Sequence, residues 1–169
     1  MKNERKQIIL QALAQLLEKR NPSKITTALL AKESKITEAA LYRHFPSKRT
    51  IYLELFNFCD FSIREKISEL KKTDKNSIEQ IKILFFFLVR FVEKNKGFAR
   101  ILSREALGPA EKNVIDAVNQ FFNSLELSVK QILADEKKLV APAGLCAQTV
   151  ITGLEGIVAR FIRNEFKEN

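Results

Sequence analysis

Residues 26–48 are TTALLAKESKITEAALYRHFPSK, and this stretch decides the fold of the N-terminal part of the chain. Thr26 or Thr27 can cap a short helix that continues to about Ser34, because threonine side chains accept hydrogen bonds from the first free amides of a helix. Thr37 can cap a second short helix, which continues to about His44 and ends before a proline. Two short helices joined by so tight a turn predict a helix-turn-helix unit.

Helical spacing of apolar residues continues on both sides of this unit, and no segment alternates with the period of a strand. The sequence therefore predicts an all-α fold. We expect the N-terminal 50 residues to form a helix-turn-helix DNA-binding domain, and residues 51–169 to form a helical body for dimerisation and partner binding. The further helices are expected at about residues 3–20, 47–70, 77–95, 98–107 and 109–138, with a last helix opened by Pro142.

Local signals suggest where the helices of the body begin and end. Ser77 and Gln80 match a capping box, so a helix is expected to start at Ser77. Gly97 is expected to end that helix, because glycine is the residue most often found just past a helix C-terminus. On the last helix, Gly153 and Gly156 are small residues within an apolar pattern, where a partner helix could approach closely. These signals favour a homodimer joined through the last long helices.

Positive charge is concentrated at the N-terminal end. The formal net charge of the chain is +9. Residues 1–50 hold 11 Lys or Arg against 4 Asp or Glu, whereas the rest of the chain holds 18 against 16. A basic surface beside a helix-turn-helix unit favours DNA as the partner, although a solvated basic face is the simpler alternative.

Several other classes are disfavoured by composition. Cys59 and Cys146 cannot build a disulfide framework, and His44 is the only histidine, so no zinc site is expected. No carboxylate pair or nucleophile–base set stands out, and we expect neither an enzyme nor a cofactor. The longest apolar run, residues 83–89, is far below the roughly 20 residues that span a bilayer. With no recognisable signal peptide, a cytoplasmic protein without a membrane partner is expected.

The second short helix supplies the candidate base contacts, because the leading residues of such a helix face the major groove. Its outward residues and the basic start of the next helix form the predicted DNA surface, with phosphate contacts assigned to Lys48 and Arg49. The full set is Thr26, Thr27, Thr37, Glu38, Ala39, Ala40, Tyr42, Arg43, His44, Lys48 and Arg49.

The same stretch resembles the TetR family of DNA-binding proteins. Its Leu-Tyr-x-His-Phe-x-x-Lys pattern, residues 41–48, is the most specific signature of that family. The resemblance implies a helix-turn-helix head on a helical dimerising body, and it implies a phosphate contact for His44. Lys35 departs from the family pattern, which has glycine in the turn. If the backbone there is left-handed, lysine costs roughly 1 kcal/mol relative to glycine.

Three separated stretches narrow the resemblance to the nucleoid occlusion factors within this family: residues 25–48, LVRFVEKNKGFARIL at 88–102 and GLEGIVARFIRNEFK at 153–167. The resemblance implies a nucleoid-associated dimer that binds chromosomal sites and antagonises the division protein FtsZ. It places the FtsZ surface at Phe58, Lys66, Arg90 and Lys94, although Phe58 could instead be a core residue. Similar chains continue beyond the position of Asn169, so part of the body surface is expected to be exposed.

Two other functions remain open. The first is a TetR-type repressor released from DNA by a small molecule, which requires an apolar pocket with a few polar groups in the body. The second is a helical adaptor that does not bind DNA, which the basic head disfavours. The sequence specifies neither the DNA site, nor the number of dimers on it, nor an inducer.

Overall fold

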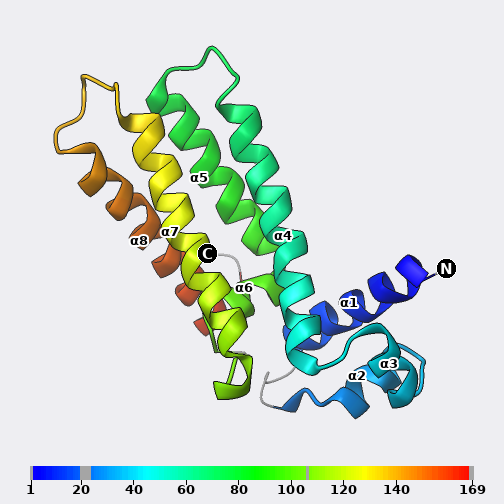
Figure 1. Ribbon diagram of the computed structural model, residues 1–169. Helices are drawn as coiled ribbons and strands as arrows, with labels where there is room; N and C mark the ends of the chain where they lie inside the picture. The colour runs from blue at the N-terminus through cyan, green and yellow to red at the C-terminus, as the bar shows by residue number, and fades with distance from the viewer. Residues whose placement is uncertain (1, 20–23, 106, 168–169) are drawn as a thin grey trace. The chain divides into compact units, whose positions relative to one another are not determined.

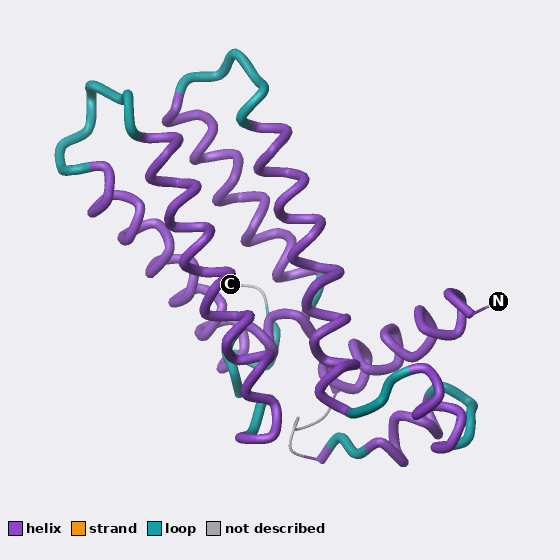
Figure 2. The backbone as a smooth tube through the Cα atoms, in the orientation of Figure 1, coloured by secondary structure: helices purple, strands orange, loops and turns teal. Residues whose placement is uncertain are grey.

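The computed structural model describes residues 2–19, 24–105 and 107–167, and within them it contains helices and no strands (Figures 1 and 2). The all-α prediction is confirmed. In chain order the elements are α1 (Lys2–Lys19), α2 (Thr27–Glu33), α3 (Glu38–His44), α4 (Lys48–Leu70), α5 (Ser77–Lys94), α6 (Lys96–Leu102), the 3-10 helix η2 (Pro109–Glu111), α7 (Lys112–Leu133) and α8 (Ala143–Arg163).

The helices are grouped in two compact units. The first unit contains residues 1–59 and 95–118, and the second contains residues 60–94 and 119–169. Helices α4 and α7 each contribute one part to each unit. The helix-turn-helix segment therefore belongs to a unit that also includes α6, η2 and the start of α7.

In the first unit, α1 packs against α6. Leu13 and Leu17 of α1 are fully buried, as is Ala99 of α6. Gly97 makes the close approach possible, because a Cβ atom there would lie 2.9 Å from the carbonyl oxygen of Ala14. The expectation that Gly97 ends the preceding helix is wrong: α5 stops at Lys94, and Gly97 lies inside α6 with a negative φ.

In the second unit, α5 packs against α8, and parts of α4 and α7 complete the core. Leu84 and Leu88 of α5 and Leu154 and Val158 of α8 are 1–3% exposed. These residues recur at spacings of four, so one face of each helix is apolar and is directed into the unit.

Two predicted helix ends differ from the structure, and so does one cap. The predicted start of α5 at Ser77 is confirmed, but the capping residue is Asn76, because the amide of Glu79 donates to its Oδ1 at 2.9 Å. Helix α6 ends at Leu102 rather than near residue 107. Helix α7 ends at Leu133 rather than Lys138, because residues 134–138 offer only one alanine and four charged side chains, and so have no apolar face to bury.

Helix α8 carries more apolar surface than its own unit covers. Among the described residues it is the one helix that is long and apolar enough, by length and composition alone, to cross a membrane, and only 33% of its most apolar window is buried. Leu145 and Ile157 are 54% and 38% exposed. Gly153 and Gly156 have open space where a Cβ atom would stand.

Candidate nucleic-acid interface

The two short helices begin at side-chain caps. Thr26 has extended backbone angles, and its Oγ1 accepts from the amide of Leu29 at 3.1 Å. Thr37 does the same for the amide of Ala40, also at 3.1 Å. Of the two threonines proposed for the first cap, Thr26 is therefore the cap. Thr27 is the first helical residue of α2.

The turn between these helices closes α2 with a left-handed residue. Lys35 has φ +55°, and its amide donates to the carbonyl of Lys32. The amide of Ile36 donates to the carbonyl of Ala31, which completes a Schellman motif, a helix ending that normally uses glycine at this position. The left-handed backbone anticipated at Lys35 is therefore present, and it fixes the direction in which α3 leaves α2.

Helix α3 buries one face and exposes the other. Leu41 is fully buried, whereas Tyr42 is 47% exposed. The other residues predicted to face outward, Thr37, Glu38, Ala39 and Arg43, are also exposed, whereas Ala40 and His44 are half-buried. The predicted orientation of α3 is thus confirmed, and its N-terminal residues form an accessible surface.

A hydrogen-bond network ties α2 to the exposed face of α3. The hydroxyl of Thr27 donates to Oε1 of Glu38, and the hydroxyl of Tyr42 lies 3.4 Å from Oγ1 of Thr27, within donating distance. Through these hydroxyl groups the network holds the Glu38 carboxylate on the surface of α3. Sequence spacing gave no sign of this network, because Thr27 is 11 residues from Glu38 and 15 from Tyr42.

At the start of α4, Lys48 is directed toward a carboxylate rather than lying free. Its Nζ is 3.8 Å from Oε1 of Glu111 and 5.3 Å from the ring centroid of Tyr52. The Lys48 side chain is only 29% exposed. Arg49, the neighbouring predicted phosphate contact, is exposed.

Glu111 is one of the two buried polar residues of the described chain, with 7% exposure. Its Oε2 accepts from the amide of Gly108 at 2.9 Å, which holds the carboxylate facing Lys48. Tyr52 is fully buried beside this pair, and burial, with a smaller contribution from the Glu111 charge, raises the pKa of its phenol. Lys48 therefore carries a positive charge between a buried anion and the outer surface of the unit.

His44 and Thr26 complete the predicted DNA surface. The Nδ1 atom of His44 is buried and has no hydrogen-bond partner among the described residues. Thr26 is exposed although its hydroxyl oxygen is used as a cap. The structure thus brings all eleven predicted DNA residues into the first unit, on α2, α3 and the start of α4.

The four residues assigned to FtsZ binding are dispersed. Phe58 is 66% exposed on α4, so it is not a core residue. Lys66 lies in the second unit and pairs with Glu69 at 3.1 Å. Arg90 pairs with Glu93 at 3.8 Å, and Lys94 is exposed one turn further along α5.

Arg90 also lines a hollow of about 410 Å³ between α5 and α8. The exposed Phe86 and Ile157 line the same hollow. The described residues contain no cluster of His, Cys, Asp or Glu suited to a metal ion.

Comparison with known proteins agrees with this geometry. Residues 9–55 match the family model described as bacterial regulatory proteins of the tetR family, and residues 75–169 match an SlmA-like model described as a tetracyclin repressor-like C-terminal domain. The nucleoid occlusion factor SlmA of Marinomonas sp. is 37% identical over 98% of this chain and 87% of its own length. SlmA of Vibrio cholerae is also 37% identical, over 98% and 88%.

Solved structures show the same fold at lower identity. A TetR-like transcriptional regulator from Rhodococcus sp. RHA1 superposes with a TM-score of 0.79 at 18% identity, covering 96% of this chain and 86% of that one. The C-terminal model alone spans more than half of the chain, and the relatives match along nearly all of it. The chain therefore belongs to the TetR family and, within it, to the SlmA branch.

Proposed function

We propose that this protein is a DNA-binding homodimer that acts as a nucleoid occlusion factor, inhibiting FtsZ-ring assembly over the chromosome. The observation that carries the DNA-binding part is the exposed N-terminal face of α3, held by the Thr37 cap and the left-handed turn at Lys35. A rigid helix with small residues at its start can enter the major groove and bring side chains to base edges.

Base and phosphate contacts are assigned to different residues. Thr37, Glu38 and Ala39 lead α3, so they are the proposed base-reading positions. Lys48 and Arg49 start α4 and are the proposed phosphate contacts, because phosphates carry no sequence information but set register and affinity. Tyr42, Arg43 and His44 lie further along α3 and are the proposed contacts to the DNA backbone.

Lys48→Ala tests this assignment. Binding to every DNA sequence should weaken alike, and the slope of log affinity against log salt should fall by about one for each contact removed in each half of the dimer. Titration of a specific and a scrambled duplex at several salt concentrations gives both quantities. A change in sequence preference without a change in slope would contradict the placement of Lys48.

The dimer is proposed to form through α7 and α8. Leu127 of α7 and Leu145 and Ile157 of α8 are large apolar residues that this unit leaves 38–54% exposed. Two such helix pairs related by a two-fold axis would bury these residues in a four-helix bundle. The exposed apolar face of α8 would then be covered by the partner chain. This contact would account for the apolar composition of α8 without a membrane.

The FtsZ surface is proposed along α4 and α5. Lys66, Arg90 and Lys94 of the second unit are cations that suit an acidic segment. Phe58, an exposed phenylalanine in the first unit's part of α4, is assigned to the same partner by the resemblance alone. The ion pairs of Lys66 and Arg90 with neighbouring glutamates are at the surface and cost little to exchange.

Double charge reversal, Lys66→Glu with Lys94→Glu, tests the FtsZ surface. The variant should retain DNA affinity, because both residues lie outside the unit that contains α3, and it should lose co-sedimentation with FtsZ on DNA. Lys75→Glu with Lys82→Glu is the matched control, since both lysines are exposed in the same unit. Equal loss in the control, or retained FtsZ binding in the test variant, would reject this surface.

A ligand-released repressor is the alternative function. Mapping of chromosomal binding sites separates the two: many sites that are sparse near the replication terminus support nucleoid occlusion, whereas one site beside its own promoter supports local repression.

A further inference from the structure

Glu38 is the one acidic residue among the eleven of the predicted DNA surface. Phosphates repel a carboxylate, so an acid at this place weakens binding unless the DNA offers it a hydrogen-bond donor. We propose that Glu38 reads a cytosine in each half-site, by accepting a hydrogen bond from the N4 amino group of that base. This inference rests on the DNA-binding function proposed above and adds to it the base that is read.

The choice of base follows from the chemistry of a carboxylate, which accepts hydrogen bonds and donates none. In the major groove, amino donors are found on N4 of cytosine and N6 of adenine. Adenine also presents its N7 acceptor beside the amino group, and this acceptor repels a carboxylate, whereas the groove edge of cytosine has no acceptor of its own. Glutamate therefore matches cytosine, while glutamine, which both donates and accepts, matches adenine.

Thr27 of α2 holds the carboxylate in position. Its hydroxyl donates to Oε1 of Glu38 and accepts from the hydroxyl of Tyr42 at 3.4 Å. Because a hydroxyl has a single proton, the bond from Tyr42 leaves the proton of Thr27 for Glu38. A carboxylate accepts at both oxygens, so Oε2 can bond to a base while Oε1 stays bonded to Thr27. The side chain is thus ordered before DNA binds, which lowers the entropy lost on binding.

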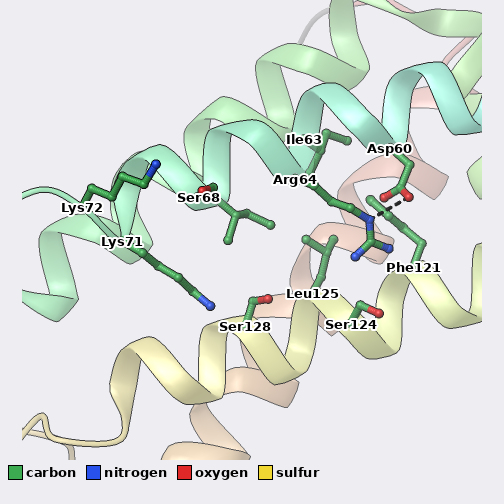
Figure 3. Close-up of a pocket in the computed structure, with 11 residues that line it drawn as sticks. Asp60, Ile63, Arg64, Ser68, Lys71, Lys72, Phe121, Ser124, Leu125 and Ser128 are labelled. Atoms are coloured by element: carbon green, nitrogen blue, oxygen red, sulfur yellow. Dashed lines mark hydrogen bonds and ion pairs between the residues drawn. The ribbon is translucent and has the colours of Figure 1, made fainter.

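The group that holds Glu38 is neutral. In the second unit, by contrast, Asp60 accepts from Nε of Arg64 at 2.8 Å, so a guanidinium offsets the charge of that carboxylate (Figure 3). The hydroxyl of Thr27 orients Glu38 without offsetting its charge. A charged acceptor strengthens the bond from a cytosine amino group and penalises a base edge that presents acceptors, so it favours discrimination between bases.

The residues beside Glu38 allow a close approach to the bases. Glu38 and Ala39 are exposed, and Ala40 is half-buried. Because both alanines are small, the start of α3 can enter the groove far enough for Glu38 to reach a base edge.

Selection of binding sites from a randomised duplex pool by the full-length protein tests the inference. The wild-type consensus should contain a cytosine in each half-site at which Glu38→Gln selects adenine instead. Glu33→Gln is the matched control, because it removes an exposed negative charge at the end of α2, and it should return the wild-type consensus.

A modified base tests the contacted atom without any change in the protein. N4-methylcytosine still pairs with guanine, but its methyl group replaces the amino proton that faces the major groove. At the cytosine identified by the selection, this base should weaken binding of the wild type at least about tenfold and binding of Glu38→Ala less than about twofold. The same base at a cytosine outside the half-sites should change neither affinity.

Thr27→Val tests the positioning role of Thr27. Valine keeps the shape of the side chain and removes the hydroxyl, while the cap of α2 is still provided by Thr26. Preference for cytosine at the position read by Glu38 should fall at least about threefold, and preference at the other positions should be unchanged. A uniform loss at every position would reject the positioning role.

The outcomes separate this inference from the function on which it rests. A wild-type selection without a consensus would reject both. A clear consensus that Glu38→Gln leaves unchanged, or wild-type binding that N4-methylation leaves unchanged, would reject the cytosine contact while DNA binding stands. The same shift in Glu38→Gln and Glu33→Gln would mean that net charge, rather than a base contact, sets the preference.

Discussion

Lys35 shows how one residue can be well placed for charge and poorly suited to its backbone. Its φ of +55° lies in the left-handed region, where a Cβ atom crowds the following carbonyl group. The side chain is exposed, so nothing in the packing of the described residues compensates for this cost. Lysine at this turn brings a cation close to the proposed DNA surface and reduces the stability of the head.

Lys35→Gly should therefore raise the free energy of unfolding by about 1 kcal/mol. Lys32→Gly, at an exposed position inside α2, should lower it by a similar amount, because glycine there only loses helix propensity. Urea denaturation of both variants gives the comparison. Equal destabilisation by the two glycines would mean that the strain at Lys35 is relieved in solution.

At the same scale, Glu111 should have a measurable effect on DNA affinity. It holds Lys48 at 3.8 Å, so a DNA phosphate must compete with a buried carboxylate for that cation. Glu111→Gln keeps an acceptor for the amide of Gly108 and removes the competing charge. DNA affinity should rise by roughly two- to fivefold per half-site, the scale of a partly exposed ion pair.

Fluorescence anisotropy with the specific duplex measures this effect. Glu54→Gln is the control, since it removes a negative charge from the same unit and releases Lys6 instead of Lys48. Higher DNA affinity in both variants would mean that the effect comes from net charge alone. Unchanged DNA affinity in Glu111→Gln would mean that Lys48 does not contact phosphate.

At the scale of elements, local sequence signals were sufficient to predict a helix end wherever that end depends on residues close by in the chain. The Thr37 cap, the end of α3 at Phe45 and the start of α8 after Pro142 were all predicted correctly, because cap geometry involves residues three or four positions apart. The outward face of α3 followed from its periodicity.

Features that depend on tertiary contact were not predicted. Gly97 allows close packing against Ala14, which is 83 residues away in the chain. In the sequence alone, a glycine at this position looks like the end of a helix. The approach of Glu111 to Lys48 and the bond from Thr27 to Glu38 likewise join residues that are not neighbours in the chain. Periodicity shows which face of a helix is apolar, but not which helix covers it.

Changes at the start of α3 should alter which DNA sequence is preferred. Thr37→Asn keeps a side chain that caps the helix, and Ala39→Ser adds a small donor, so both leave the fold intact while presenting new groups to base edges. Selection from a randomised duplex pool should return an altered consensus for each. Lys48→Ala should return the unaltered consensus; if it alone shifts the preference, α3 is not the reading helix.

At the scale of the whole molecule, the proposed dimer would cover the exposed apolar face of α8. Gly153→Leu should weaken the dimer at least about tenfold, because a bulky side chain would stand in the open space where the partner helix approaches. The substitution also favours the helix itself by several tenths of a kcal/mol or more, so the monomer should remain folded.

Sedimentation equilibrium across nanomolar to micromolar concentrations gives the dimer constant. Gly153→Ala is the size-matched comparison and should have a smaller effect than leucine. A dimer constant unchanged in both variants would place the two-fold contact elsewhere on the body.

The discontinuity of the first unit has a consequence for how the protein is made. Its N-terminal part ends at residue 59, but α6, which packs against α1, is not synthesised until residues 96–102, and the unit is completed at residue 118. At roughly 5–20 residues per second, the ribosome adds those last 59 residues in about 3–12 seconds. Until α6 is made, the face of α1 that packs against it is uncovered, so a chaperone on the emerging chain would find its binding site on α1.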